Sequence, residues 1–107
     1  MEILIYQTEA EETPFLLWLE ALKDTRAKSA VRARLSRLQA GNFGDSKALH
    51  DGVSELRIQY GQGFRVYFSR QGPVIVLLLV GGEKSSQDKD IDRAIAFLED
   101  WKSRPDV

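Results

Sequence analysis

Hydrophobic and polar residues alternate along residues 55–69, and this alternation predicts a β-hairpin. If the segment 61–63 forms a three-residue turn, Tyr60 pairs with Phe64 and residues of equal parity share one face. The even face is apolar and comprises Leu56, Ile58, Tyr60, Phe64, Val66 and Phe68. The odd face comprises Glu55, Arg57, Gln59, Arg65, Tyr67 and Ser69. In this register Arg57 lies opposite Tyr67 and diagonal to Arg65, about 7–8 Å away, so an anion would relieve the repulsion between the two arginines.

Outside the hairpin, apolar spacing predicts three helices and two more strands. The strands are expected at 3–7 and 74–80, and the helices at 13–24, in the residues before Gly41, and from Ser85 to about Trp101. Residues 42–52 lack periodicity and are expected to form a loop, and Gly81 and Gly82 are expected to end a strand. The predicted order β-α-α-β-β-β-α is an α+β fold. Two antiparallel N-terminal helices cover one face of a mostly antiparallel four-stranded sheet, with the C-terminal helix near the 81–86 loop.

Composition favours one small domain, residues 1–107. The chain has no cysteine, so neither disulfides nor thiolate metal sites are expected. Its longest apolar run, 74–80, is too short to cross a bilayer, and the first residues lack the basic and apolar regions of a signal peptide. We therefore expect a soluble cytoplasmic protein that does not contact a membrane.

The formal net charge of −1 conceals a separation of charge along the chain. The first quarter is acidic, whereas the second predicted helix is rich in arginine and lysine. Arg34 and Arg37 on this helix are candidate RNA-binding residues. The alternative is that they are solvated helix positions that form i,i+4 contacts.

Three motifs that suggest a cofactor do not meet the requirements for binding one. The 81–85 sequence Gly-Gly-Glu-Lys-Ser lacks the glycine that a phosphate-binding loop places before its lysine. The acidic run 88–92 has calcium-loop spacing, but Arg93 stands where that loop requires glycine. His50 is the only histidine and has no cysteine to join it in a zinc site. No metal and no cofactor are expected, and His50 remains either a surface residue or a proton carrier.

Taken together, three sequence segments resemble the RelE/ParE superfamily of type II toxins, in particular HigB-like killer proteins of phage-derived addiction modules. The segments are Val-Ser-Glu-Leu-Arg at 53–57, Gly-Gln-Gly-Phe-Arg-Val-Tyr-Phe at 61–68 and Leu-Leu-Leu-Val-Gly-Gly-Glu-Lys-Ser-Ser-Gln-Asp-Lys-Asp-Ile at 77–91. The order of elements matches along the whole chain. The resemblance implies a toxin that cleaves messenger RNA in the ribosomal A site without a metal. It also implies a cognate antitoxin, often a helix-turn-helix protein.

The same resemblance implies catalytic roles for Arg57, Arg65 and Lys84. The C-terminal tyrosine of the RelE prototype has no evident counterpart, because Ile91 or Asp90 stands at the nearest position. His50, Tyr67 and Asp90 therefore stay open as proton-transfer groups. Gln59, Tyr67, Gln87, Arg34 and Arg37 are the candidate RNA-binding residues. Tyr67 is either a stacking platform for a nucleobase or a packed strand residue.

Two other functions compete with ribosome-dependent mRNA cleavage. The same superfamily includes ParE-like toxins, which poison DNA gyrase by binding and are not nucleases, and the fold does not separate the two activities. The basic residues at 57, 65 and 84 favour the nuclease. A third interpretation is a binding module whose arginine face meets only an acidic protein.

Overall fold

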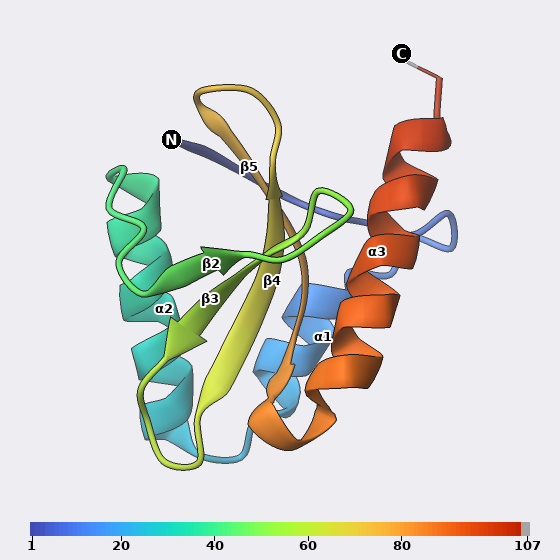
Figure 1. Cartoon of the computed structure of the whole chain (residues 1–107). Coiled ribbons are helices and arrows are strands. Elements are labelled where there is room, and N and C mark those ends of the chain that lie inside the picture. Colours follow the sequence, from blue (N-terminus) through green and yellow to red (C-terminus); the bar gives the residue numbers. More distant parts are fainter. Residues whose placement is uncertain (106–107) are drawn as a thin grey trace.

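The computed structural model describes residues 1–105, which form five strands and three helices (Figure 1). In chain order the elements are β1 (Glu2–Ile5), α1 (Pro14–Ala21), α2 (Thr25–Gln39), β2 (Ser46–Ala48), β3 (Ser54–Ile58), β4 (Phe64–Arg70), β5 (Ile75–Glu83), the 3-10 turn η1 (Lys84–Ser86) and α3 (Gln87–Ser103). The α+β class is confirmed.

The sheet is mixed and five-stranded, in the order β1-β5-β4-β3-β2. β1 runs parallel to β5, and the other neighbours are antiparallel. The predicted four-stranded sheet was wrong because β2 lies within the stretch expected to be a loop. β2 is a three-residue edge strand with no hydrophobic alternation, so its pairing with β3 is invisible in the sequence pattern.

The β3–β4 hairpin keeps its predicted faces but not its predicted register. Ile58 pairs with Phe64 and Arg57 with Arg65, so the loop spans residues 59–63 rather than 61–63. Gly61 and Gly63 both have positive φ, and the Gly63 amide donates to the Tyr60 carbonyl at 2.9 Å. Because the shift is two residues, parity is conserved and the even positions still face the core.

β5 does not end at its glycines but continues through them to Glu83. A Cβ on Gly81 would lie 2.2 Å from the Trp18 ring of α1, and a Cβ on Gly82 would lie 1.8 Å from Oδ2 of Asp90 in α3. The two glycines therefore let helices on opposite faces approach the strand closely.

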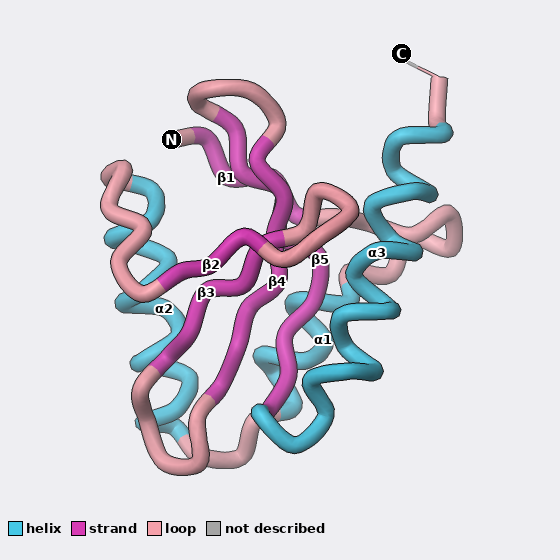
Figure 2. Tube along the Cα trace, in the orientation of Figure 1, coloured by secondary structure: helices cyan, strands magenta, loops and turns pink. Residues whose placement is uncertain are grey.

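The sheet lies between α3 and the pair α1 and α2 (Figure 2), and a hydrophobic core lies on each of its faces. One core joins α1 and α2 to the even face of the hairpin, through Phe15, Leu19, Val31, Leu56 and Val66 among others. The other joins α3 to the opposite face, through Tyr6, Val53, Tyr67, Leu77, Ala94 and Leu98 among others. The odd face of the hairpin was expected to be open to water, but its residues 67 and 69 are buried beneath α3.

The helix ends are set by local hydrogen bonds. The Asp24 carboxylate caps α2 by accepting from the amides of Arg26 and Ala27. α3 continues to Ser103 rather than fraying after Trp101, and Arg104 donates to the Gln7 carbonyl at 2.6 Å. No helix within residues 1–105 is both long enough and apolar enough to span a membrane.

Candidate functional site

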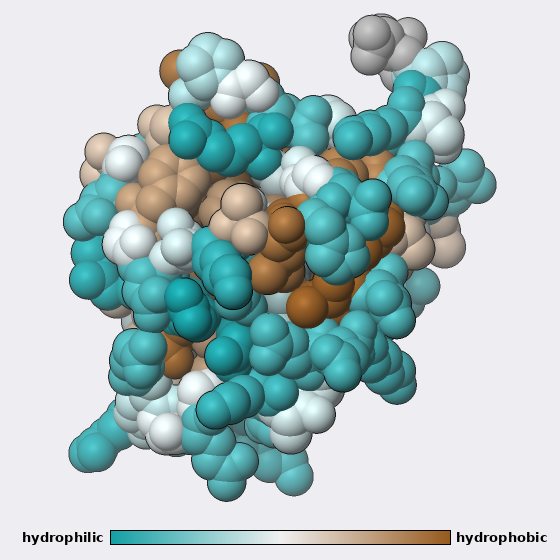
Figure 3. Space-filling model, viewed as in Figure 1, coloured by the Kyte–Doolittle hydropathy of each residue, from teal (hydrophilic) through white to brown (hydrophobic). Residues whose placement is uncertain are grey.

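The two predicted catalytic arginines are cross-strand neighbours near the end of β3 and the start of β4. Figure 1 shows these strand ends at the lower end of the sheet, close to where α3 begins. Arg57 on β3 and Arg65 on β4 are direct cross-strand partners, so their Cβ atoms are about 4.5–5.5 Å apart on one face. Arg65 also pairs with Gly82 of β5. Hydrophilic side chains dominate this end of the molecule (Figure 3).

A buried carboxylate, that of Glu55, holds the two guanidinium groups together. Its Oε2 accepts from Nε of Arg65 at 3.1 Å, and its Oε1 lies 3.9 Å from Nε of Arg57. The Glu55 side chain is 4% exposed, that of Arg65 12% and that of Arg57 37%. Two cations directly opposite each other would repel, and the carboxylate between them offsets that repulsion.

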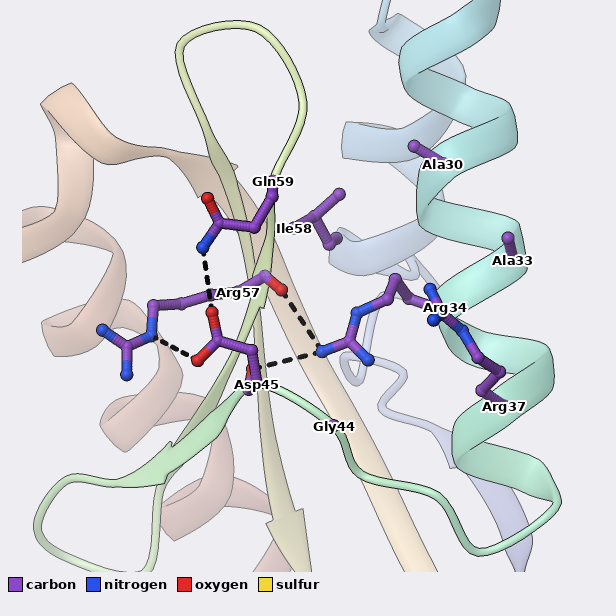
Figure 4. Close-up of a pocket in the computed structure, with 9 residues that line it drawn as sticks. All are labelled: Ala30, Ala33, Arg34, Arg37, Gly44, Asp45, Arg57, Ile58 and Gln59. Atoms are coloured by element: carbon purple, nitrogen blue, oxygen red, sulfur yellow. Dashed lines mark hydrogen bonds and ion pairs between the residues drawn. The ribbon is translucent and has the colours of Figure 1, made fainter.

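Asp45 and Gln59 complete the outer side of this arrangement (Figure 4). Oδ1 of Asp45 lies 3.2 Å from Nε of Arg57, and Oδ2 accepts from Nε2 of Gln59 at 2.9 Å. In Figure 4 the end of the Arg57 guanidinium points away from α2. Among residues 1–105, the contacts of Arg57 and Arg65 to these carboxylates use Nε, and the terminal nitrogens form no hydrogen bond. These terminal nitrogens are the donors that could grip a phosphate.

Two more predicted residues lie in η1 and at the start of α3. Nε2 of Gln87 donates to Oε2 of Glu55 at 3.3 Å, so Gln87 contacts the cluster directly. Lys84 follows β5 on η1, where its amide donates to the Gly63 carbonyl at 3.4 Å. Its ammonium group is exposed and forms no ion pair within the described residues. We call Glu55, Arg57, Arg65 and Gln87 the arginine cluster. Among the described residues, no side-chain contact joins Lys84 to this cluster.

Arg34 is a structural residue rather than an open RNA contact. Its guanidinium donates to the carbonyls of Phe43, Asp45 and Arg57, which holds α2 to the edge of β3. Burial, followed by repulsion from Arg37, lowers the Arg34 pKa below its usual range. The prediction of Arg34 as an RNA-binding residue is therefore corrected. Arg34 and Arg37 both line a hollow of about 360 Å³ between α2 and β3. Arg37 is exposed there and remains available to contact RNA.

Tyr67 and Asp90 are buried, which changes their predicted roles. Tyr67 lies opposite Glu55 but is 0% exposed, so it does not offer a surface for a nucleobase. Burial, with the charges of Glu55 and Asp90, raises its pKa well above the ordinary value, and its hydroxyl has no partner within residues 1–105. Asp90 accepts a hydrogen bond from Ser86 at 2.5 Å and packs over Gly82. Both groups are about as buried as Glu55, so exposure does not distinguish these three as proton-transfer groups.

His50 lies away from the arginine cluster. It occupies the turn between β2 and β3, at the opposite end of β3 from Arg57, and its Nδ1 is 2.9 Å from Oδ2 of Asp51. The ring and its partner are both exposed. The structure therefore does not bring His50 together with the arginines.

Glu55 is the residue that the sequence analysis placed on the correct face without assigning it a role. Its equal parity with Arg57 and Arg65 is the signal that could have identified it. The cluster can bind a phosphodiester through guanidinium ends and accept a proton on a carboxylate. Within residues 1–105, no three or more acidic or histidine side chains are grouped to hold a metal ion.

Comparison with known proteins finds a relative but no activity. No known family model matches the chain. A protein of Haemophilus influenzae, described as an uncharacterized protein, is 58% identical over 77 residues. The match covers 72% of this chain and 78% of the relative.

Proposed function

The chain belongs to the same family as this Haemophilus protein, and we propose that it is a type II toxin of the RelE/ParE kind that cleaves translated messenger RNA. The relative carries no activity over to this chain, because its description names none. The proposal rests instead on the arginine cluster and on the sequence resemblance set out above.

The observation that carries the proposal is the direct pairing of Arg57 with Arg65 around the buried Glu55. Both arginines meet carboxylates through Nε: Arg65 meets Glu55 at 3.1 Å, and Arg57 meets Asp45 at 3.2 Å and Glu55 at 3.9 Å. Their terminal nitrogens stay unbonded within the described residues, and the exposed Lys84 lies beyond the end of β5. Such a set of donors suits the dispersed negative charge of a phosphate during displacement.

In the proposed reaction the ribose 2′-hydroxyl attacks the adjacent phosphorus and the 5′-oxygen leaves. Glu55 takes the 2′-hydroxyl proton, because it is the carboxylate held within the cluster. Arg57 and Arg65 stabilise the added negative charge on the phosphoryl oxygens. Lys84 protonates the departing 5′-oxygen. The products are a 2′,3′-cyclic phosphate and a 5′-hydroxyl.

The remaining parts of the proposal concern substrate and partners. Gln59, Gln87 and the exposed Arg37 border the cluster or the adjoining hollow and would contact the RNA on either side of the cut. The ribosome would present the message, and a cognate antitoxin, in this family often a helix-turn-helix protein, would silence the toxin. The protein would work in the cytoplasm without a cofactor.

The test is induced expression followed by mapping of transcript 5′ ends. We expect codon-phased cuts in translated messages with the wild-type chain and none with Arg65→Ala. Arg70→Ala is the control, because this arginine is on the same strand at its other end. Its side chain donates to the Pro73 carbonyl and lies over the Phe43 ring, away from the arginine cluster. Full cleavage by Arg65→Ala would remove the arginine cluster from the mechanism.

A gyrase poison is the second candidate, and one observation favours it. Glu55 and Asp45 both lie against the arginines, so these carboxylates balance much of the positive charge of Arg57 and Arg65 within the protein. Intact messages together with a DNA-damage response after induction would support this function and contradict RNA cleavage.

A further inference from the structure

The helix α2 carries a positive charge that the rest of the described chain does not balance. It contains arginine and lysine but no acidic residue. Arg34 turns inward, and the other cations are exposed or half-buried: Arg26, Lys28, Arg32 and Arg37. None of these four forms an ion pair within residues 1–105. The nearby Asp24 carboxylate caps the helix and accepts from Tyr60 at 2.8 Å, so it offsets the charge of Arg26 only in part.

This placement of charge works against the stability of the helix. Lys28 and Arg32 are four residues apart, so two like charges are neighbours on the helix surface. Arg26 and Lys28 lie in the first turn, where the helix macrodipole disfavours cations. By contrast, α3 begins with acidic residues and has Lys102 in its last turn. Sites that break such local rules are commonly functional, and a basic stripe along one helix is typical of a surface that binds a polyanion.

The cations lie on two flanks of the exposed side of α2. At 3.6 residues per turn, Arg26 and Arg37 share one flank, and Lys28 and Arg32 share the other. Small exposed residues lie between the flanks: Ser29, Ala33 and Ser36. Within residues 1–105, the exposed large apolar side chains all lie outside α2. This side therefore lacks the large anchors that a protein partner uses. We call these four cations and three small residues the α2 basic face.

We infer that the α2 basic face binds the phosphate backbone of double-helical RNA. Cations on two flanks, spread along about 16 Å of helix axis, match two phosphate strands better than one. The small residues between them let the helix lie close to the wide, shallow minor groove of RNA, where the Ser29 and Ser36 hydroxyls meet ribose 2′-hydroxyls. The choice of RNA over DNA rests on these hydroxyls and on the proposed function.

The α2 basic face is separate from the arginine cluster. α2 and α3 cover opposite faces of the sheet (Figure 2), and the cluster lies on the face of α3. The end of the Arg57 guanidinium points away from α2 in Figure 4. Arg37 alone also borders the hollow beside β3, so the test uses Lys28 and Arg32 on the other flank.

The test is fluorescence anisotropy of the whole protein with a labelled RNA duplex of about 16 base pairs and mixed sequence, without ribosomes, at several KCl concentrations. We expect a Kd of about 1–100 μM at about 100 mM KCl. The logarithm of the binding constant should fall with the logarithm of salt with a slope of about −3, which corresponds to three or four phosphate contacts. A gel run after the titration checks that the RNA is intact.

Lys28→Ala and Arg32→Ala should each weaken binding about threefold to tenfold and reduce the salt slope by about 1. Arg32→Lys should restore most of the binding, because a phosphate contact needs mainly the charge. Lys102→Ala is the matched control, since it removes one exposed cation from α3 and should leave binding unchanged. Thermal unfolding of each variant checks the fold, and Arg32→Ala should not be less stable than the wild type because it relieves a like-charge pair.

Three competitors test the kind of partner. A DNA duplex of the same sequence and a single-stranded RNA of equal length should each bind about threefold or more weakly, and replacing Ser29 and Ser36 by alanine should remove the difference between the two duplexes. Equal or tighter binding of either competitor would overturn the inference. Polyglutamate that displaces the RNA at equal charge would also overturn it, because the face would then suit an acidic protein.

The outcome is distinguishable from failure of the proposed function. Duplex binding by Lys28→Ala and Arg32→Ala at the wild-type affinity would overturn the α2 basic face even if Arg65-dependent cleavage is observed. Conversely, binding that depends on these two residues in a protein that cuts no message would sustain the face and refute the cleavage proposal.

Discussion

Replacing Glu55 by glutamine should destabilise the fold in a way that an added anion reverses. The substitution preserves size and removes the buried negative charge that contacts both Arg57 and Arg65. Breaking a buried ion pair on one side costs about 3–5 kcal/mol. The exposed end of Arg57 and the amide oxygen left at position 55 reduce this to about 2–3 kcal/mol. For a domain of this size the melting temperature would fall by about 10–20 °C.

The assay is thermal and urea unfolding of Glu55→Gln, followed by tryptophan fluorescence and circular dichroism at constant ionic strength. Phosphate should bind the outer ends of the two guanidinium groups more tightly once the carboxylate charge no longer offsets theirs. At about ten times its Kd, phosphate would stabilise the variant by about 1.4 kcal/mol, and it would stabilise the wild-type protein by less. Glu83→Gln is the control, because this exposed carboxylate lies at the same end of the sheet and forms no ion pair within the described residues.

A Glu55→Gln protein within about 0.5 kcal/mol of wild type would refute the reasoning, since surface substitutions commonly have effects of that size. An equal response of both proteins to phosphate would show that no anion enters between the arginines.

Three further predictions concern the fold. Leu56→Asp, at a position that is 0% exposed, should leave the chain unfolded by circular dichroism, because it buries a charge without a partner. Gly82→Ala should destabilise by about 1–3 kcal/mol in urea unfolding, because its Cβ would meet Asp90, and adding Asp90→Ala should recover part of the loss. Burial and the hydrogen bond to Asp100 raise the pKa of Tyr6 from 10.0 to about 12, so the folded state favours the neutral phenol. The free energy of unfolding should therefore fall as the pH rises from 10.0 to about 12. In urea unfolding over this pH range, Tyr6→Phe should show a smaller fall in that free energy than the wild-type protein.

Parity explains why the sequence predicted the hairpin faces while missing the register. The even positions from Leu56 to Phe68 line the α1–α2 core as expected. Turn length is decided by the positive φ angles of Gly61 and Gly63, and several glycine turns fit the same pattern. A shift of two residues leaves every side chain on its face, so hydrophobicity could not reveal that Arg57 faces Arg65 directly.

The features that the sequence did not predict depend on contacts between segments that are distant along the chain. The position of α3 over the second face of the sheet buries Tyr67, and nothing in the local alternation of residues 64–70 signals that cover. The role of Arg34 arises from three backbone carbonyls beyond the helix, which apolar spacing does not report. Glu55 likewise gains its place only when β3, β4 and α3 meet.

The most direct test of the arginine cluster compares RNA binding and RNA cleavage on translating ribosomes for two variants. Arg65→Ala should lose both, because it removes a phosphate donor. Glu55→Gln should retain binding and lose cleavage, because it keeps both guanidinium groups but cannot accept the 2′-hydroxyl proton. Cleavage by Glu55→Gln and Arg65→Ala at the wild-type rate would contradict the assignment of the cluster as an RNA-cleaving site.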